Sequence, residues 1–206
     1  MAGNSSIYLA SRSPRRRELL NQIGVAHEVL TRRITAERSP DVNEDPLPGE
    51  KPREYVMRVC RDKVESGWMR VIQRKLPLRG VLAADTSVCL GDEILGIPTS
   101  AVQAVDFLTR LSGREHEVLT AVAFKLVERV ETELSVTAVR FRELSHTEIA
   151  RYVASGEPMD KAGAYGIQGR AGAFIAEIRG SYSGVMGLPL YETVLLLRRF
   201  GLAPAG

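Results

Sequence analysis

The sequence has few of the residues on which several common chemistries depend. Its 206 residues include two cysteines and three histidines. Cys60 and Cys89 form no CxxC pair, which argues against a structural zinc and a secreted disulfide framework, so we expect both thiols to be buried. The histidines fit no HExxH motif and lie near no nucleophile, so neither a histidine-bound zinc nor a serine-type triad is supported. Any chemistry must depend on carboxylates and cations.

Long apolar runs are also absent. The longest purely aliphatic run, Val194–Leu197, is far shorter than the roughly 20 residues that a bilayer requires, and the N-terminus lacks a signal pattern. We therefore expect a cytoplasmic protein with no membrane partner. No GxxxxGK[ST] loop occurs, so any phosphate must be held by other means. The composition, 44% hydrophobic and 26% charged, is typical of one large globular domain or two small lobes.

Positive charge is concentrated in the first 80 residues, where 16 Lys and Arg oppose 10 Asp and Glu, whereas the remainder has 12 against 15. Arginine outnumbers lysine 23 to 5, which favours planar recognition of phosphate or carboxylate, although genomic base composition produces the same bias. The N-terminal half should therefore attract anions. A net charge of +3 supplies no continuous basic stripe, so nucleic acid is not an expected partner.

Apolar periodicity alternates between strand and helix patterns, which predicts an α/β fold with a mixed sheet and helices on its faces. Ser13 before Pro14 predicts a helix start, and Ser145 with Glu148 forms a capping box. Gly91-Asp92 predicts a hairpin. The predicted strands are residues 6–10, 25–31, 80–90, 93–95, 115–127, 132–142 and 173–178. The predicted helices are residues 14–23, 52–66, 101–111, 145–154 and 189–200, with a loop at 32–51.

The turn after the first predicted strand, Leu9 to Arg16, carries several arginines at a helix N-terminus. Free backbone N–H groups and the positive end of the helix dipole attract anions there, while each cation opposes the dipole at a cost of a few tenths to about 1 kcal/mol. A bound polyanion therefore explains the arginines better than stability does, and loss of Arg16 should leave stability unchanged or slightly higher. A solvated basic helix face is the alternative.

A carboxylate interrupts the apolar strand pattern of Val81–Val88. Burial of an unpaired carboxylate costs several kcal/mol, so Asp85 requires a cation, a metal or hydrogen-bond donors nearby. It is a candidate metal ligand, or a general base that orients water for attack on a phosphoryl group. A structural role, in which Asp85 fastens a neighbouring loop, fits the pattern equally well.

A third candidate segment, Gly156–Gly169, contains four glycines, which allow the backbone to approach a ligand closely. Lys161 offers a point charge, and the Gln168 amide offers both a donor and an acceptor. A glycine-rich surface loop is the alternative, and the segment by itself decides nothing.

In order along the chain, these segments resemble the Maf family of nucleoside triphosphate pyrophosphatases. The matching stretches are LASRSPRRRELL at 9–20, AADTSV at 83–88, LSGREHEVLTAVA at 111–123, GEPMDKAGAYGIQG at 156–169 and IRGSYSGVMGLPL at 178–190. The resemblance covers nearly the whole chain. It implies a single elongated α/β domain over residues 1–206, with two lobes around a central cleft and an architecture related to the inosine triphosphate pyrophosphatases. It also implies hydrolysis of a nucleotide between its α- and β-phosphates with a divalent cation, Mg, Mn or Co. The sequence leaves the oligomeric state open, with a homodimer as one alternative.

The resemblance also assigns residues by position. Asp85 matches the catalytic carboxylate and metal ligand. The positions that line the phosphate cleft are Ser11, Arg16, Lys63 and Lys161. The specificity positions are Arg15, Thr86 and Gln168, whose identities resemble the dTTP/UTP branch, where modified pyrimidine nucleotides are further substrates, more than the 7-methyl-GTP branch.

Two departures from the family pattern bear on catalysis. The family has an acidic pair just after the second strand, where this chain reads Ile34-Thr35-Ala36-Glu37, and Glu37 with a shifted loop would supply one acid. The family also has a lysine before the hairpin proline, where this chain has Ile97, which cannot hold a phosphate. Three functions therefore remain open: a dTTP/UTP pyrophosphatase, the same enzyme acting on another base such as 7-methyl-GTP, and a nucleotide- or nucleic-acid-binding regulator of septum formation with weak catalysis.

Overall fold

The computed structural model describes residues 6–30 and 42–202. Its strands are β1 (Ile7–Leu9), β2 (His27–Val29), β3 (Val81–Leu90), β4 (Glu93–Leu95), β5 (Glu115–Leu126), β6 (Arg129–Phe141) and β7 (Ile175–Arg179). Its helices are α1 (Pro14–Gln22), α2 (Pro52–Gln73), α3 (Ala101–Leu111), α4 (His146–Ala154), α5 (Tyr182–Met186) and α6 (Leu190–Arg199), with 3-10 turns η1 (Glu157–Asp160), η2 (Ala162–Ala164) and η3 (Arg170–Phe174).

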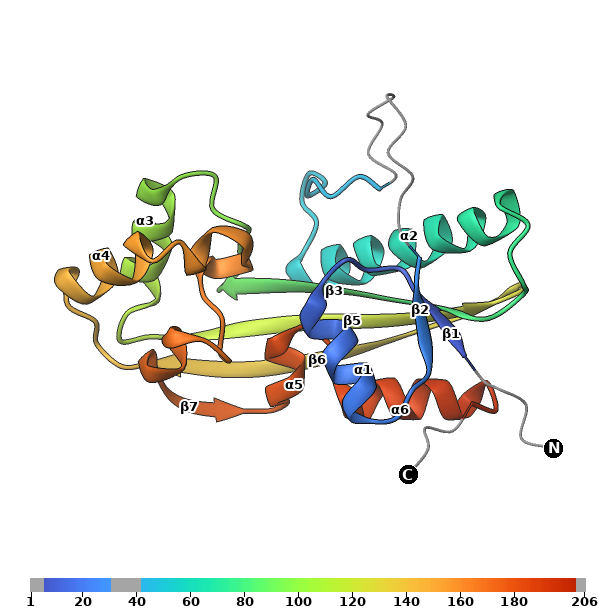
Figure 1. Ribbon diagram of the computed structural model, residues 1–206. Helices are drawn as coiled ribbons and strands as arrows, with labels where there is room; N and C mark the ends of the chain where they lie inside the picture. Colours follow the sequence, from blue (N-terminus) through green and yellow to red (C-terminus); the bar gives the residue numbers. More distant parts are fainter. Residues whose placement is uncertain (1–5, 31–41, 203–206) are drawn as a thin grey trace.

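The strands form one mixed sheet in the order β2-β1-β3-β5-β6-β7, with β4 paired to β3. The β1 strand runs parallel to β2 and β3, whereas the remaining pairs are antiparallel. This mixed sheet confirms the α/β prediction. The long strands β5 and β6 run through both ends of the molecule, and α3 and α4 pack at one end while α1, α2 and α6 pack at the other (Figure 1). The molecule is therefore elongated and has two lobes.

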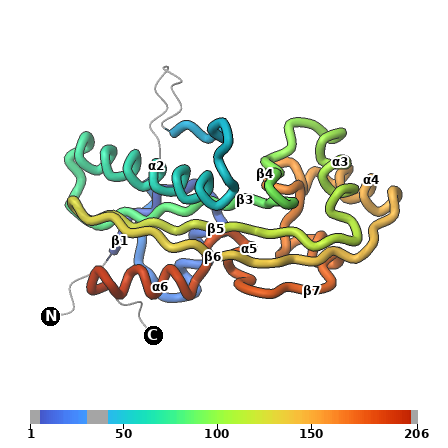
Figure 2. Tube along the Cα trace, turned by 180° about the vertical axis from the view of Figure 1, so that it is seen from behind, coloured from blue at the N-terminus to red at the C-terminus, as the bar shows by residue number. Residues whose placement is uncertain are grey.

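Side-chain alternation along β3 separates two of the hydrophobic clusters. Val81 and Ala83 pack against α2 on one face, whereas Leu82 and Ala84 pack with residues of α1 and α6 on the other. Figure 2 shows α2 and α6 on opposite faces of the sheet. A third cluster, around α3, α4 and the 3-10 turns, fills the second lobe. The order of side chains in one strand therefore decides which helix each residue meets.

Most predicted boundaries agree with the structure to within three residues. Ser13 is the N-cap of α1, and the Ser145 hydroxyl accepts a hydrogen bond from the backbone N–H of Glu148, as the capping box predicted. The hairpin at Gly91 is also present, as the antiparallel pairing of β3 with β4 shows. The predicted second strand was too long, since β2 ends at Val29, and Thr31 lies outside the described residues.

Three elements correct the sequence prediction. Helix α2 continues to Gln73 because Trp68 and Val71 extend its buried stripe beyond the predicted end near Ser66. The last strand, β7, begins at Ile175, two residues after its predicted start, because η3 occupies the preceding residues. Helix α5 was missed, since its five residues are too few to show helical periodicity.

In the described parts of the chain, no helix is both long enough and apolar enough to cross a membrane.

Candidate functional site

A cleft of about 1030 Å³ lies between the two lobes and is lined by residues from both. All eight predicted site residues line it: Ser11, Arg15, Arg16, Lys63, Asp85, Thr86, Lys161 and Gln168. The structure thus brings together side chains that are up to 157 positions apart in the sequence. This placement makes the eight side chains neighbours in one cleft.

The cleft opens where β3 lacks a neighbour along one edge. On that side β3 pairs with β1 at Val81 and Leu82, and with β4 only from Val88 onward. Between these points, β5 is its single described partner. Asp85 faces α2 and Thr86 faces the opposite side, and the gap between β1 and β4 admits both to the cleft. A ligand in the cleft therefore meets side chains from both faces of the sheet.

The partner of Asp85 in the structure is a cation from α2. Lys63 Nζ lies 2.7 Å from Asp85 Oδ1, while the Asp85 residue is only 8% exposed. The same nitrogen lies 2.9 Å from Oε2 of Glu44, in the segment before α2. One lysine therefore joins two carboxylates at the edge of the cleft. The Asp85 pairing agrees with the expectation that a buried carboxylate requires a compensating group.

Glu44 is a residue that the sequence analysis did not single out. The acid expected near this position was Glu37, which lies outside the described residues. The structure places Glu44 in the lining of the cleft, beside Lys63. The available signal was the pair Glu44-Asp45 shortly before the helix that carries Lys63, but nothing local in the sequence connects that pair with Asp85.

Arg16 joins three separate segments at the base of the cleft. Its Nε donates to the carbonyl of Gly187 at 2.7 Å, and Nη1 donates to Ser11 Oγ at 3.2 Å. Its Nη2 lies 3.4 Å from Thr86 Oγ1. Burial lowers the pKa of Arg16, and the nearby Asp85 carboxylate opposes that change. The guanidinium therefore connects α1, β3 and the turn after α5.

These contacts lead us to expect the opposite of the sequence-based prediction that loss of Arg16 leaves stability unchanged or slightly higher. We expect Arg16→Ala to lower the free energy of unfolding by about 1.5–3 kcal/mol, the usual contribution of hydrogen bonds to a charged group. Denaturant unfolding measures the effect, with Arg17→Ala as the matched control, since Arg17 is exposed on the same helix. Equal unfolding midpoints for the two variants would show that the Arg16 contacts contribute nothing.

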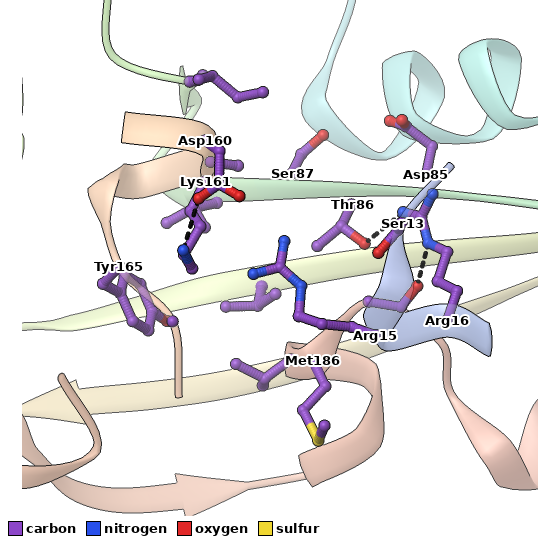
Figure 3. Close-up of a pocket in the computed structure, with 18 of the residues that line it drawn as sticks. Ser13, Arg15, Arg16, Asp85, Thr86, Ser87, Asp160, Lys161, Tyr165 and Met186 are labelled. Atoms are coloured by element: carbon purple, nitrogen blue, oxygen red, sulfur yellow. Dashed lines mark hydrogen bonds and ion pairs between the residues drawn. The ribbon is translucent and has the colours of Figure 1, made fainter. Parts of the chain in front are cut away.

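The other wall of the cleft belongs to the second lobe. Lys161 Nζ donates to the carbonyl of Glu157 at 2.6 Å and lies 2.5 Å from Asp160 Oδ1. Arg15 extends from the α1 turn toward Lys161 (Figure 3), and its Nε is buried without a hydrogen-bond partner among the described residues. Gln168 lines the cleft but is exposed to solvent. These donors leave room for a ligand that accepts hydrogen bonds.

Apolar side chains also contribute to the lining of the cleft. Val118, Val185 and Met186 contribute to the lining, together with the ring of Tyr165. The Tyr165 hydroxyl lies 2.8 Å from Nε2 of buried His116, which fixes the ring at the wall. The cleft therefore offers apolar surface as well as a cationic turn, a combination suited to a ligand with a flat apolar part and an anionic part.

Ile97 is placed at the cleft by the hairpin and the residues after it. It belongs to the lining, and the residue is 58% exposed. This exposed apolar side chain stands where the family resemblance leads one to expect a lysine.

The carboxylates of the cleft fit a divalent cation of the hard, oxygen-binding kind. Glu44 and Asp85 both lie within hydrogen-bond distance of Lys63 Nζ, so the two carboxylates are close to each other. Mg²⁺ commonly binds through one or two carboxylates together with substrate phosphates. No group of three or more His, Cys, Asp or Glu suited to a metal occurs among the described residues, so an all-protein metal cage does not form there.

Fold and cleft together define a two-lobed α/β protein whose interlobe cleft combines a cationic helix turn with a pair of carboxylates joined by a lysine. Comparison with known families identifies it further. The family model described as Maf-like protein matches residues 6–200, and the chain belongs to that family.

Relatives of high identity have one name in common. The chain is 55% identical over 202 residues to a dTTP/UTP pyrophosphatase of Nitrosomonas europaea, covering 98% of this chain and 97% of that protein. It is 56% identical to a protein of the same name from Aromatoleum aromaticum, covering 95% of each. Among solved structures it resembles the Staphylococcus aureus Ham1 protein with a TM-score of 0.42 and 13% identity, over 66% of this chain and 71% of the other.

Proposed function

We propose that this protein is a nucleoside triphosphate pyrophosphatase, a hydrolase of acid anhydrides that converts dTTP and UTP to the monophosphate and pyrophosphate. The observation that carries the proposal is the Asp85–Lys63–Glu44 cluster, which lies in the same cleft as the cationic α1 turn. The names of relatives at 51–56% identity support the same activity and the same two substrates.

In this proposal the phosphates lie over the α1 turn. Ser11 and the N-terminus of α1 donate to phosphate oxygens, and Arg16 and Lys161 supply compensating charge. Asp85 accepts a proton from a water molecule while the oxygen of that water attacks the α-phosphorus. The bond between the α-phosphorus and the bridging oxygen then breaks, and pyrophosphate leaves with the electron pair of that bond. Lys63 compensates the charges of Asp85 and Glu44. A divalent cation, Mg²⁺, Mn²⁺ or Co²⁺, held by Asp85 and Glu44, would neutralise phosphate charge when bound.

The base occupies the second lobe in this arrangement. Its ring lies on the apolar wall, within reach of Arg15 and Gln168, while Thr86 closes the pocket near the sugar. The Thr86 hydroxyl is fixed by two neighbours, since it lies 3.4 Å from Arg16 Nη2 and 3.1 Å from Thr120 Oγ1. The specificity residues thus remain those that the family resemblance suggested.

The function is tested by pyrophosphate release over a panel of nucleotides with Mg²⁺, Mn²⁺ and Co²⁺. Hydrolysis of dTTP and UTP, with the monophosphate as the second product, is the expected result. Faster hydrolysis of 7-methyl-GTP or of a purine triphosphate would show that the reaction is right and the base is wrong. Tight nucleotide binding without turnover would favour a regulator with weak catalysis, as the absence of the family lysine at Ile97 would then explain.

Substitution of Ile97 is expected to raise catalytic activity. We expect Ile97→Lys to raise kcat several-fold, because an ammonium at this exposed position of the lining would help to hold the attacked phosphate. Steady-state kinetics with UTP measure the change, and Ile97→Met is the control for altered side-chain shape. Unchanged or lower kcat in Ile97→Lys would mean that Lys63 or Lys161 already supplies the missing charge.

Three further expectations stay predictions. A single Maf-like domain is supported by one family model over residues 6–200. A cytoplasmic location is supported by the two buried free cysteines, which suit a reducing compartment. A homodimer, one alternative for the oligomeric state, is tested by light scattering.

A further inference from the structure

Burial does not fix the position of the Glu44 side chain in the cleft. Its side chain is 60% exposed, and its ion-pair partner is Lys63. It belongs to a described stretch, residues 42–51, that contains neither helix nor strand. Such a side chain can adopt several rotamers, and the position of its backbone sets the region that its carboxylate can reach. The position of the Glu44 carboxylate must therefore depend on what holds the backbone around it.

Two side chains of α2 hold three successive carbonyls of that segment. Arg58 Nη1 donates to the carbonyl of Asn43 at 3.0 Å, and Arg58 Nη2 donates to that of Asp45 at 3.0 Å. The Tyr55 hydroxyl donates to the carbonyl of Glu44 itself at 2.8 Å. Because the carbonyls before, at and after Glu44 are all bonded, its Cα is fixed relative to α2, the helix that also carries Lys63.

Arg58 is itself fixed by an acid from the same segment. Glu50 accepts two hydrogen bonds from the guanidinium, at 2.6 Å from Nε and 2.9 Å from Nη2. The Arg58 bond lowers the pKa of Glu50 to about 2, so the acid stays ionised at neutral pH. The guanidinium also lies over the ring of Tyr55, at 5.6 Å from the ring centroid. Arg58 therefore has one orientation, in which its remaining donors reach the two carbonyls.

Stabilisation of the α2 N-terminus alone does not explain this arrangement. That helix end has its own contacts, since the backbone N–H of Lys51 donates to Glu54 and Pro52 occupies the first helical position. The bonds from Arg58 and Tyr55 go instead to the residues around Glu44. Tyr55 also lines the cleft, and burial raises its pKa to about 12, so its hydroxyl remains a donor.

We propose that Arg58 and Tyr55 are positioning residues that place the Glu44 carboxylate against Lys63 and Asp85, and so determine how well the cleft holds a divalent cation. The inference rests on the proposed function for the role of the cation in turnover, but its geometry is independent of that function. Loss of a group that orients a metal ligand commonly costs 10- to 100-fold in metal affinity or activity.

The test is a double-mutant cycle on the full chain. We expect Arg58→Leu to raise the Mn²⁺ dissociation constant, measured by electron paramagnetic resonance, and to lower kcat, each by about tenfold or more, with KM for UTP little changed. Tyr55→Phe keeps the ring and should cost a few-fold. In a Glu44→Gln background the same substitutions should change either quantity by less than about twofold, because they act through Glu44.

Two controls separate positioning from folding and from function. Arg53→Leu removes an exposed arginine of the same helix, whose partner is Glu117, and should leave Mn²⁺ binding unchanged. If Arg58→Leu fails to fold, Tyr55→Phe decides the outcome. If the parent hydrolyses no nucleotide, the proposed function is refuted, but the Mn²⁺ dissociation constants of the variants still test whether Arg58 and Tyr55 position Glu44. Equal effects with and without Glu44, or a parent that binds no Mn²⁺, would overturn it.

Discussion

Asp85→Asn is expected to lower turnover of UTP and dTTP by at least about 10²-fold, the usual contribution of a general base. The amide has almost the same shape as the carboxylate, but it cannot take a proton from water. It also removes one of two carboxylates near Lys63, so the cleft would hold a divalent cation less well. Both losses act on the chemical step, and kcat measured at saturating UTP reports them.

Folding and nucleotide binding should survive that substitution. Lys63 retains Glu44 as its partner, so no cation is left unpaired. Asp92→Asn is the matched control, because Asp92 lies on the adjoining hairpin and pairs with Lys51 in an exposed position. Calorimetric titration with UTP checks binding, and thermal unfolding checks stability. Near-normal turnover in Asp85→Asn would refute the assignment of Asp85 as the catalytic carboxylate, whatever its effect on stability.

Hydrolysis of dTTP and UTP should exceed that of CTP, ATP and GTP by about 10- to 100-fold in kcat/KM. Uracil and thymine present an N3–H group between two carbonyl oxygens, whereas cytosine has one carbonyl and an amino group. The Arg15 guanidinium has only donors, and its Nε is unpaired among the described residues, so it favours a base rich in carbonyl oxygens. Each polar group left unpaired costs about 1–3 kcal/mol, which gives that range.

The Gln168 amide should contribute a smaller part of the selectivity. Gln168 is exposed, so water can replace a lost hydrogen bond, and the factor of about 10⁴ that a fully buried mismatch produces is not expected. We expect Gln168→Leu to reduce the preference for UTP over CTP by about tenfold or less. Competition assays with paired nucleotides measure it, and Arg170→Leu, two residues along the same exposed turn, is the control. A purine preference in the parent would contradict the dTTP/UTP assignment.

Local patterns in the sequence were sufficient for most of the fold. The alternation of apolar residues predicted the long strands, and capping residues such as Ser13 and Ser145 marked helix starts, because these signals act between residues close in the chain. The parts of the fold that the sequence did not predict were either too short to show a period or continuations of a predicted helix. Helix α5 has five residues, and the end of α2 depends on burial of Trp68 against the sheet, which no local signal reports.

The site also combines features that local sequence signals predict with contacts between residues far apart in the chain. Asp85 was recognisable alone, because a carboxylate in an apolar strand must have a partner, and the arginines of the α1 turn were recognisable because cations oppose a helix dipole. Only the tertiary structure decides which group pairs with Asp85 and which groups bind the arginines of the α1 turn. Lys63 meets Asp85 because α2 covers the face of β3 to which odd-numbered residues point.

The α1 turn shows which contacts local reasoning leaves out. From the sequence, Arg16 is an unfavourable cation at a helix N-terminus. In the structure its guanidinium bonds to the carbonyl of Gly187, 171 residues away, and so joins the two ends of the chain. The dipole penalty acts within one helix turn, whereas the compensating bond forms only after the C-terminal segment has packed.

By itself, therefore, the sequence determined the mixed α/β character, the positions of most elements and the residue types of the site, because periodicity, capping and unpaired charge act locally. The tertiary structure decided which charges meet. It decided that the acid beside Lys63 is Glu44, that Arg58 and Tyr55 hold its backbone, and that the cleft opens at the gap between β1 and β4. Strand register and helix packing create these contacts, and both depend on residues far apart in the chain.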